Sequence, residues 1–260
     1  MMSKKLSDRS LEPEGIFVTQ PVPWVPAAYM RKAAKFLVEH AAAGLFLDPG
    51  LRKTSITLAA IQFLKKRGLV KRVLVLSPLR PCYLVWPAEI KKWLDFVDLR
   101  IEVLHGPGKE EALARDADIY VCNYDGLPWL LGARWVVTGG RRELKWNHER
   151  WEKLGFDTLV CDELSKLKHP KTNRFKMLKQ VLPTFYRRWG LTGSPAANTL
   201  LDLFGQSYVL DLGKALGKYI THYRLRYFAP PFYGSFKWII KEGAEGEIQG
   251  QAQRLPLQKM

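Results

Sequence analysis

The chain has 260 residues, a hydrophobic fraction of 47% and a net charge of +16, from 41 Lys and Arg against 25 Asp and Glu. This composition indicates a globular protein with a real core, and it offers neither a membrane span of about 18 apolar residues nor the apolar centre of a signal peptide. The positive charge favours a polyanionic partner, with nucleic acid first, although a basic surface without a partner also accounts for it.

Strand-like and helix-like runs alternate after a loose polar leader at residues 1–26. The strands are short, apolar on both faces and β-branched, as in a buried parallel sheet. Such alternation predicts an α/β fold whose mainly parallel sheet is flanked by helices and binds ligands at the carboxyl ends of its strands. Strands are expected at 44–48, 72–77, 100–104, 118–123, 158–162 and 188–192, and helices at 27–42, 53–67, 84–94 and 172–182.

Three further segments complete the chain. Residues 128–157 are rich in Trp and Arg and form an excursion from the sheet, and residues 200–242 form a mainly helical extension. Residues 243–260 are polar and without pattern, which predicts disorder. The scattered cysteines, Cys82, Cys122 and Cys161, lack metal-ligand spacing and fit a reducing cytoplasm as free thiols.

Two motifs at expected strand ends point to a nucleotide site. The run from Asp48 through Pro49, Gly50, Leu51 and Arg52 to Lys53, Thr54 and Ser55 joins a strand to a helix. A lysine and a hydroxyl at such a turn can hold the phosphates of a nucleotide and its Mg²⁺. Asp162 and Glu163 close another strand, where one acid can hold Mg²⁺ and the other can orient a water molecule. A surface lysine at a helix start and a solvated strand end are the simpler explanations.

Five segments in order resemble the motifs of Snf-type superfamily II helicases, and phage-encoded members are especially similar. They are the run 48–54, Ser77-Pro78, the Asn123-Tyr124-Asp125 triplet, the acidic pair with its basic extension 164–168, and the motif III run 191–198. The resemblance covers about residues 27–240 and implies the N-terminal RecA-like lobe, at 27–199, of a DNA-dependent ATPase.

The resemblance also implies individual roles. Lys53, Asp162 and Glu163 are the catalytic residues, and Thr54 and Asp162 hold the metal of Mg²⁺-ATP. Residues that couple this site to DNA are Thr192, Gly193 and Ser194, and residues that line the DNA track are Ser77, Pro78, Arg80 and Tyr124. Motif III also reads as a plain turn, and of the four track residues only Arg80 has obvious phosphate chemistry.

Three departures from the family pattern weaken this reading. Arg52 replaces the glycine before Lys53, where close approach of the backbone to phosphate leaves little room for a side chain. Met30 follows Tyr29 where the family has a glutamine for adenine. We also expect the chain to lack the second RecA-like lobe of the family with its arginine finger, and such a finger contributes about 10³-fold or more in rate.

The expected function is therefore the ATP-binding lobe of a helicase or translocase, slowed by Arg52 and by the missing lobe. Its expected partners are DNA, most readily double-stranded, and a second lobe or partner protein. Its expected location is the cytoplasm, of the host if the gene belongs to a phage. A catalytically inert basic DNA-binding module is the main alternative, and a P-loop ATPase of another kind with a protein partner is a weaker one.

Overall fold

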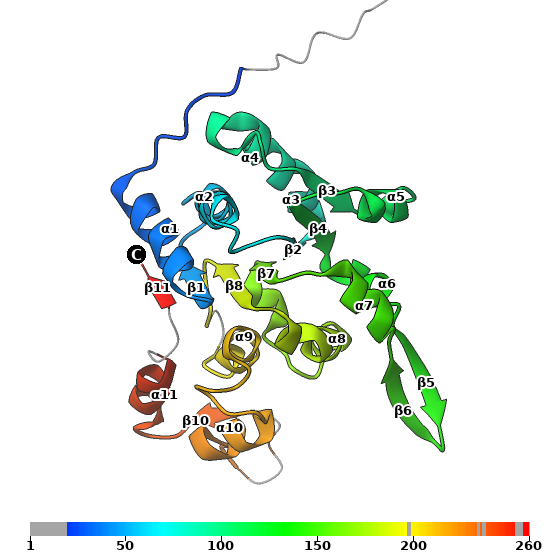
Figure 1. Cartoon of the computed structure of the whole chain (residues 1–260). Coiled ribbons are helices and arrows are strands. Elements are labelled where there is room, and N and C mark those ends of the chain that lie inside the picture. Colours follow the sequence, from blue (N-terminus) through cyan, green and yellow to red (C-terminus); the bar gives the residue numbers. More distant parts are fainter. Residues whose placement is uncertain (1–19, 197–198, 233–234, 236–237, 253–256, 260) are drawn as a thin grey trace, which may run out of the picture.

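The computed structural model describes residues 20–196, 199–232, 235, 238–252 and 257–259, so most of the expected leader lies outside the described residues. Seven parallel strands form the central sheet (Figure 1), in the order β11-β1-β8-β7-β2-β4-β3. The six expected strands are all present. Their bounds are Ala42–Phe46 for β1, Val73–Ser77 for β2, Ile101–Leu104 for β3, Ile119–Asn123 for β4, Thr158–Asp162 for β7 and Arg187–Thr192 for β8.

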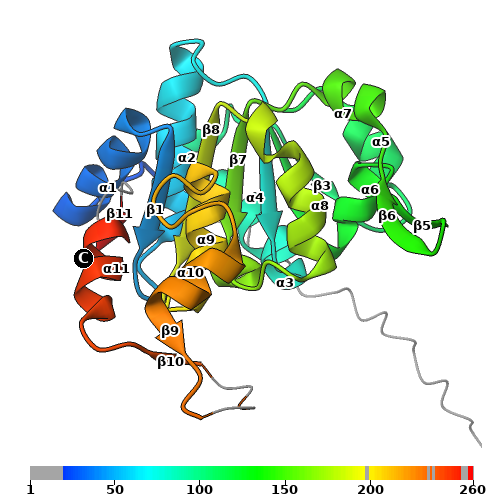
Figure 2. The ribbon, with the colours of Figure 1, turned by 90° about the horizontal axis from the view of Figure 1, so that it is seen from below.

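The strand register brings the predicted motifs to one level of the sheet. Phe46 lies beside Thr192, and Asp162 lies beside Leu191. On the other side of β7, Ser77 lies beside Asn123. Because all these strands are parallel, their carboxyl ends share one edge (Figure 2), and every motif follows a strand at that edge.

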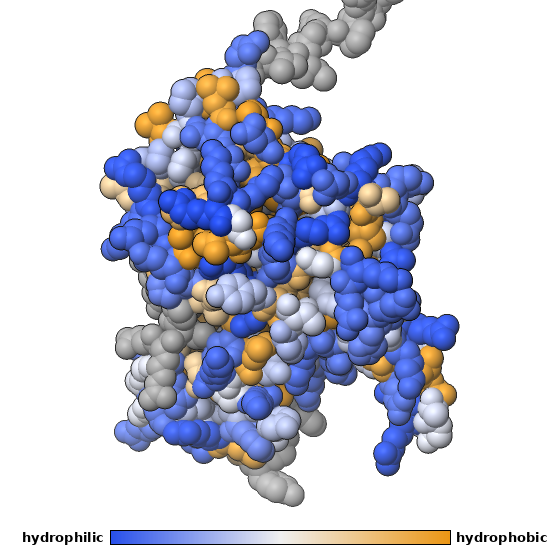
Figure 3. Space-filling model, in the orientation of Figure 1, coloured by the Kyte–Doolittle hydropathy of each residue, from blue (hydrophilic) through white to orange (hydrophobic). Residues whose placement is uncertain are grey.

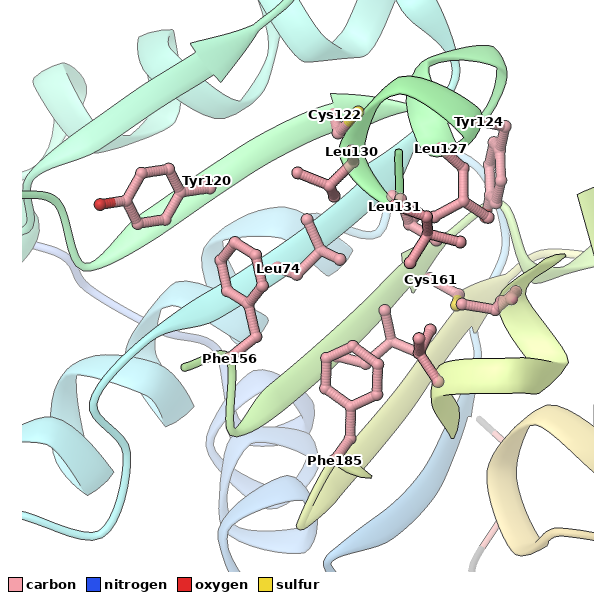
Figure 4. Close-up of a cluster of buried hydrophobic side chains, with 14 of the residues drawn as sticks. Leu74, Tyr120, Cys122, Tyr124, Leu127, Leu130, Leu131, Phe156, Cys161 and Phe185 are labelled. Carbon is pink, nitrogen blue, oxygen red and sulfur yellow. The ribbon is translucent and has the colours of Figure 1, made fainter. Parts of the chain in front are cut away.

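Alternate residues of each strand point into two separate cores. Val73, Val75 and Val160 belong to the core on one face, and Leu74, Leu159 and Cys161 belong to the core on the other. Figure 4 shows part of this second core, in which Leu74, Tyr120 and Phe156 lie along the strands. Burial on both faces explains why these strands read as continuous apolar runs.

Helices cover both faces of the sheet (Figure 1). On one face lie α1 (Ala28–Glu39), α2 (Lys53–Lys66), α3 (Leu79–Leu84), α4 (Trp86–Lys92) and η1 (Leu94–Phe96). On the other face lie α5 (Lys109–Ala114), η2 (Tyr124–Gly126), α6 (Leu127–Leu130), α7 (His148–Leu154), η3 (Leu164–Leu167), α8 (Asn173–Val181), η4 (Leu182–Thr184) and α9 (Asp202–Asp211). The helix expected at 84–94 is present as α4, which η1 follows, whereas α3 before it was not expected.

The excursion at 128–157 leaves the sheet as expected. It contains α6, α7 and, between them, an antiparallel hairpin of β5 (Arg134–Thr138) and β6 (Arg141–Lys145). The hairpin stands away from the rest of the molecule (Figure 1).

The C-terminal part packs as a small third core beside α9. It holds α10 (Ile220–Tyr227), the strands β9 (Phe228–Ala229) and β10 (Ile239–Ile240), and α11 (Ala244–Ala252). The structure thus departs from the disorder expected at 243–260, where it places α11 and the strand β11 (Leu257–Lys259). In α11 only Ala244 and Ile248, one helical turn apart, are buried. Two apolar positions are too few to show a helical period, so the sequence did not predict this helix.

Hydrophilic residues cover most of the face seen in Figure 3. None of the helices in the described ranges has the length and apolar character that crossing a membrane requires. All three cysteines are buried free thiols, and burial raises the pKa of Cys82 to about 11 and that of Cys122 to about 12. They are therefore core residues without reactive thiolates.

Candidate functional site

The loop between β1 and α2 has the left-handed turns of a phosphate-binding loop. Gly50 has a φ of 87° and Arg52 a φ of 51°, and α2 begins at Lys53. The Lys53 ammonium group donates hydrogen bonds to the carbonyl oxygens of Leu47, at 2.7 Å, and Asp48, at 3.2 Å. The ammonium group that would bind phosphate therefore bonds to the backbone of its own loop in this structure.

Lys53 is also electrostatically linked to the acidic pair. Burial lowers the pKa of Lys53, and the negative charges of Glu163, Asp162 and Asp48 partly offset that effect. The lysine and the two acids, predicted from separate parts of the sequence, thus lie within one electrostatic environment. A half-buried cation close to carboxylates can exchange its partners when an anionic ligand enters.

Arg52 adopts a backbone conformation that favours glycine. Its φ and ψ of 51° and 38° are left-handed, while its side chain is exposed and its guanidinium carbon lies 5.8 Å from the centroid of the Trp93 ring. The guanidinium group therefore packs on the Trp93 ring. What remains of the predicted crowding is the Cβ atom, held at the loop by a strained backbone.

Asp162 is held by donors from two neighbouring segments. Its Oδ2 atom accepts hydrogen bonds from Ser77 Oγ at 2.8 Å and from Trp86 Nε1 at 3.0 Å. Burial raises the pKa of Asp162, and these two donors act against that rise by stabilising the ionised form. Both donors meet Oδ2, so they fix the carboxylate while Oδ1 has none of these bonds.

Glu163 is positioned by two hydroxyl groups and by an unusual backbone. Its Oε1 atom accepts hydrogen bonds from Ser165 Oγ at 2.5 Å and Thr192 Oγ1 at 3.0 Å. Its φ of 61° is positive, as are those of Arg52 and Leu212 alone among the described non-glycine residues. Two of these three strained residues lie in this site, which is where strained backbone tends to be retained.

The motif III segment closes against the loop. The Leu47 amide donates to the Thr192 carbonyl oxygen at 3.1 Å. A Cβ atom on Gly193 would lie 3.1 Å from Pro49 Cδ, so only glycine fits here without a shift of the loop. Ser194 is exposed, its amide lying 3.4 Å from Thr192 Oγ1. The end of the motif, Ala197-Asn198, lies outside the described residues.

Two of the four residues predicted to line a DNA track are buried. Ser77 and Tyr124 are 0% and 4% exposed, and their hydroxyl groups bond to Asp162, Ser77 to the side chain and Tyr124 to the backbone oxygen at 2.9 Å. The expectation that their side chains contact DNA is therefore corrected: they brace the acidic pair. Pro78 is half-buried and Arg80 is exposed, so Arg80 keeps its predicted surface position.

The residues present fit a Mg²⁺-nucleotide. Thr54 lies half-buried in the first turn of α2, whereas the hydroxyl group of the buried Ser55 donates to the Arg52 carbonyl oxygen at 3.1 Å. Within the described residues no cluster of three or more His, Cys, Asp or Glu side chains is suited to a metal. A few protein oxygens near a lysine suit Mg²⁺, which takes its remaining ligands from phosphate and water.

Sequence reasoning missed Trp86 and Ser165. Ser165 follows Glu163 by two residues, and a hydroxyl so near a candidate base was a readable signal. Trp86 lies in α4, far from Asp162 in the sequence, and no spacing in the sequence links its indole to that acid.

We expect Trp86→Phe to move the acid limit of Mg²⁺-nucleotide binding to higher pH. The indole N–H stabilises the ionised Asp162, so removing it raises the pKa of that carboxyl further. Asp162 then becomes protonated sooner as the pH falls, and a protonated carboxyl holds no Mg²⁺. The free energy of unfolding should fall by about 1.5 to 3 kcal/mol through the lost charge-assisted bond.

Nucleotide-analogue binding measured against pH provides the check for Trp86→Phe. The control is Trp151→Phe, which removes the indole donor to Thr184, 3.0 Å away and outside the site. Equal pH profiles for both variants would contradict the role assigned to Trp86.

Comparison with known proteins identifies the family of the chain. The family model of the SNF2-related domain matches residues 29–213. The chain is 29% identical over 217 residues to protein p41 of Acyrthosiphon pisum secondary endosymbiont phage 1, a match that covers 79% of this chain and 43% of that protein.

Solved structures agree as well. The Sulfolobus solfataricus SWI2/SNF2 ATPase core in complex with dsDNA matches with a TM-score of 0.69 at 23% identity, over 92% of this chain and 45% of that one. The ATPase core domain of the same organism gives 0.66 at 21% identity, over 97% and 47%. This chain thus spans less than half the length of these relatives and has the RecA-like fold of their ATPase core. With most of its length matched by the family model, the chain belongs to the SNF2-related domain family.

Proposed function

We propose that this chain is the nucleotide-binding lobe of a DNA-dependent ATPase that works as a helicase or translocase. The observation that carries the proposal is the meeting of three motifs at one edge of the sheet. Lys53 lies in the field of Asp162 and Glu163, and Thr192 joins Glu163 to the strand beside the phosphate loop. A structural role alone does not explain why a lysine, two acids and a hydroxyl converge there.

Each residue has a distinct task in this proposal. Lys53 leaves the carbonyl oxygens of the loop and binds the β- and γ-phosphates, and Thr54 and Asp162 supply oxygens to Mg²⁺. Mg²⁺ held by these two residues would neutralise charge on the phosphates. Glu163, held by Ser165 and Thr192, orients the attacking water and takes its proton. Thr192 thereby ties the base to motif III, which is the segment proposed to sense DNA.

Duplex DNA is the proposed partner, with the host cytoplasm as the proposed location. The net charge of +16 supports a polyanion, and one of the structural relatives is described in complex with dsDNA. Exposed Arg80, just beyond β2 at the edge that holds the nucleotide site, is the best-placed of the predicted track residues for a phosphate contact. A second lobe, supplied by the same protein or by a partner, would complete the ATPase.

The proposal is tested by comparing the chain with Lys53→Ala and Glu163→Gln. Lys53→Ala should lose binding of a fluorescent Mg²⁺-ATP analogue but keep binding to duplex DNA. Glu163→Gln should keep analogue binding and lose whatever DNA-stimulated hydrolysis the chain has. Analogue binding that is indifferent to Lys53 would refute a nucleotide site in this loop.

A catalytically inert DNA-binding module is the second candidate. The strained Arg52 and the hydrogen bonds of Lys53 to its own loop favour it. It predicts DNA binding whose logarithm falls linearly with the logarithm of salt concentration and does not change with ATP. A DNA affinity that responds to Mg²⁺-ATP would exclude it.

A further inference from the structure

The hairpin of β5 and β6 has a sharply defined conformation. Two glycines, Gly139 and Gly140, connect the strands with φ values of 57° and 75°. Positive φ at both positions is the mark of a two-residue type I′ turn, whose twist matches that of the strands. Thr138 and Arg141 are the last pair before the turn, so the two strands stay in register along the whole hairpin.

The base of the hairpin is anchored to the body of the protein. Trp135 and Leu144 are cross-strand partners, and both pack against the core on the α8 side of the sheet. The Asn147 amide donates to the Leu131 carbonyl oxygen at 3.0 Å and closes the neck. The projecting half is therefore a braced ribbon and not an open loop.

The hairpin carries four basic side chains and one acid. The acid, Glu143, lies 3.5 Å from Lys145, and the Arg142 guanidinium carbon lies 4.8 Å from the centroid of the Trp135 ring. In the part of the chain that the structure describes, Arg134 and Arg141 form no ion pair, and both are exposed. Two or more cations are thus available to an external anion.

An apolar side chain is exposed on the face of the ribbon opposite to Arg134 and Arg141. Val137 is 74% exposed and is the cross-strand partner of Arg142. Figure 3 shows hydrophobic colour on the flank of the projecting hairpin, next to hydrophilic residues. A β-branched apolar residue is thus exposed near the tip of a ribbon whose other face carries Arg134 and Arg141, both without an ion pair among the residues that the structure describes.

We propose that this hairpin is a second contact with duplex DNA and enters the major groove. The major groove, about 12 Å wide, admits a two-stranded β-ribbon, and the three residues of each strand beyond the anchored Trp135 and Leu144 reach about 10 Å, enough for a groove depth of about 8.5 Å. Arg134 and Arg141 then face the phosphates along the groove, and Val137 meets thymine methyl groups. The inference rests on the proposed function, because it gives that function an additional DNA-binding element.

The position of the hairpin agrees with such a contact. Its neck follows β4, η2 and α6, so it grows from the carboxyl edge of the sheet, where the nucleotide site lies. DNA bound along that edge would pass the root of the hairpin.

A shortened hairpin tests the inference. Deleting residues 137–138 together with 141–142 removes two facing pairs and leaves Gly139 and Gly140 between Val136 and Glu143, which are already partners. Two residues leave each strand, so the alternation of faces is kept and Trp135 and Leu144 remain anchored. The double variant Arg141→Gln/Arg142→Gln removes the same two charges without changing the backbone.

Binding of a mixed-sequence duplex is measured by fluorescence anisotropy over a range of salt concentrations. Each lost phosphate contact should lower the salt slope by about 0.9, and either variant loses the contact of Arg141, so the slope should fall by about 0.9 with an affinity loss of about tenfold at 0.1 M salt. The matched control, Lys32→Gln/Lys66→Gln, removes two exposed charges from α1 and from the far end of α2. It should change the slope far less.

The outcomes separate the inference from the proposed function. Hairpin variants that bind duplex like the control would overturn the hairpin contact while duplex binding by the unaltered chain still stands. An equal loss on single-stranded DNA would overturn the groove placement. If the unaltered chain binds no DNA, both the proposed DNA function and the hairpin contact fail.

Discussion

Arg52→Gly is expected to strengthen Mg²⁺-ATP binding by about tenfold or more, an estimate of about 1.4 kcal/mol or above. Glycine accepts the left-handed conformation that Arg52 now holds and removes the Cβ atom from the loop. Backbone N–H groups of the loop can then approach phosphate closely. A fluorescent Mg²⁺-ATP analogue titrated into both proteins measures the change.

Arg52→Ala distinguishes the two parts of the arginine side chain. It removes the guanidinium group that lies beside Trp93 but keeps the Cβ atom and the left-handed backbone. We expect it to bind nucleotide as weakly as the unaltered chain and to be about 1 to 2 kcal/mol less stable than Arg52→Gly. Tight Mg²⁺-ATP binding by Arg52→Ala would show that the guanidinium group, and not the Cβ atom, obstructs the loop. Tight Mg²⁺-ATP binding by the unaltered chain would show that Arg52 does not obstruct the loop.

Gly205→Ala is expected to destabilise the protein by about 3 kcal/mol or more, because overpacking against rigid atoms is costly. A Cβ atom at Gly205 would lie 2.6 Å from the Lys168 carbonyl oxygen and closer still to that of Leu167. Both are backbone atoms of the segment that follows the acidic pair. For a protein of this size the melting temperature should fall by about 6 to 12 °C.

Gly205 also lies on the helix that connects two of the motifs. The Lys168 ammonium group pairs with the buried Asp202 at 3.0 Å, and Gln206 donates to the Pro195 carbonyl oxygen beside motif III. Displacing α9 should therefore weaken nucleotide binding as well as stability. Gly246→Ala in α11 is the control, because its Cβ would meet nothing within 4 Å and alanine should stabilise that helix by about 0.5 to 1 kcal/mol. A harmless Gly205→Ala would mean that α9 is free to move.

The sheet could be predicted from the sequence because its strands are buried on both faces. Runs such as 73–76 and 158–161 contain no exposed face to interrupt the apolar pattern. The chemistry of Lys53 marks the start of a helix, and that of Asp162 marks the end of a strand. Helix bounds at 53–66 and 173–181 were predicted to within a residue or so. At these places the local sequence pattern agrees with burial in the folded protein, so the pattern predicts the structure.

Other features depend on contacts that no local pattern records. Ser77 and Tyr124 have polar hydroxyl groups, yet both are buried because Asp162 accepts their hydrogen bonds. Trp86 reaches the same acid from a helix 76 residues away in sequence. Such bonds are visible only once the strands are side by side.

The pairing of β1 bears on how the protein reaches this structure. The strand that enters the phosphate loop spans 42–46, and its two neighbours in the sheet are β8 at 187–192 and β11 at 257–259. No hairpin or adjacent strand can hold β1 in place early, and contacts between such distant segments slow folding. We therefore expect the nucleotide loop to gain protection from hydrogen exchange late in refolding, after β2, β4 and β7 have paired.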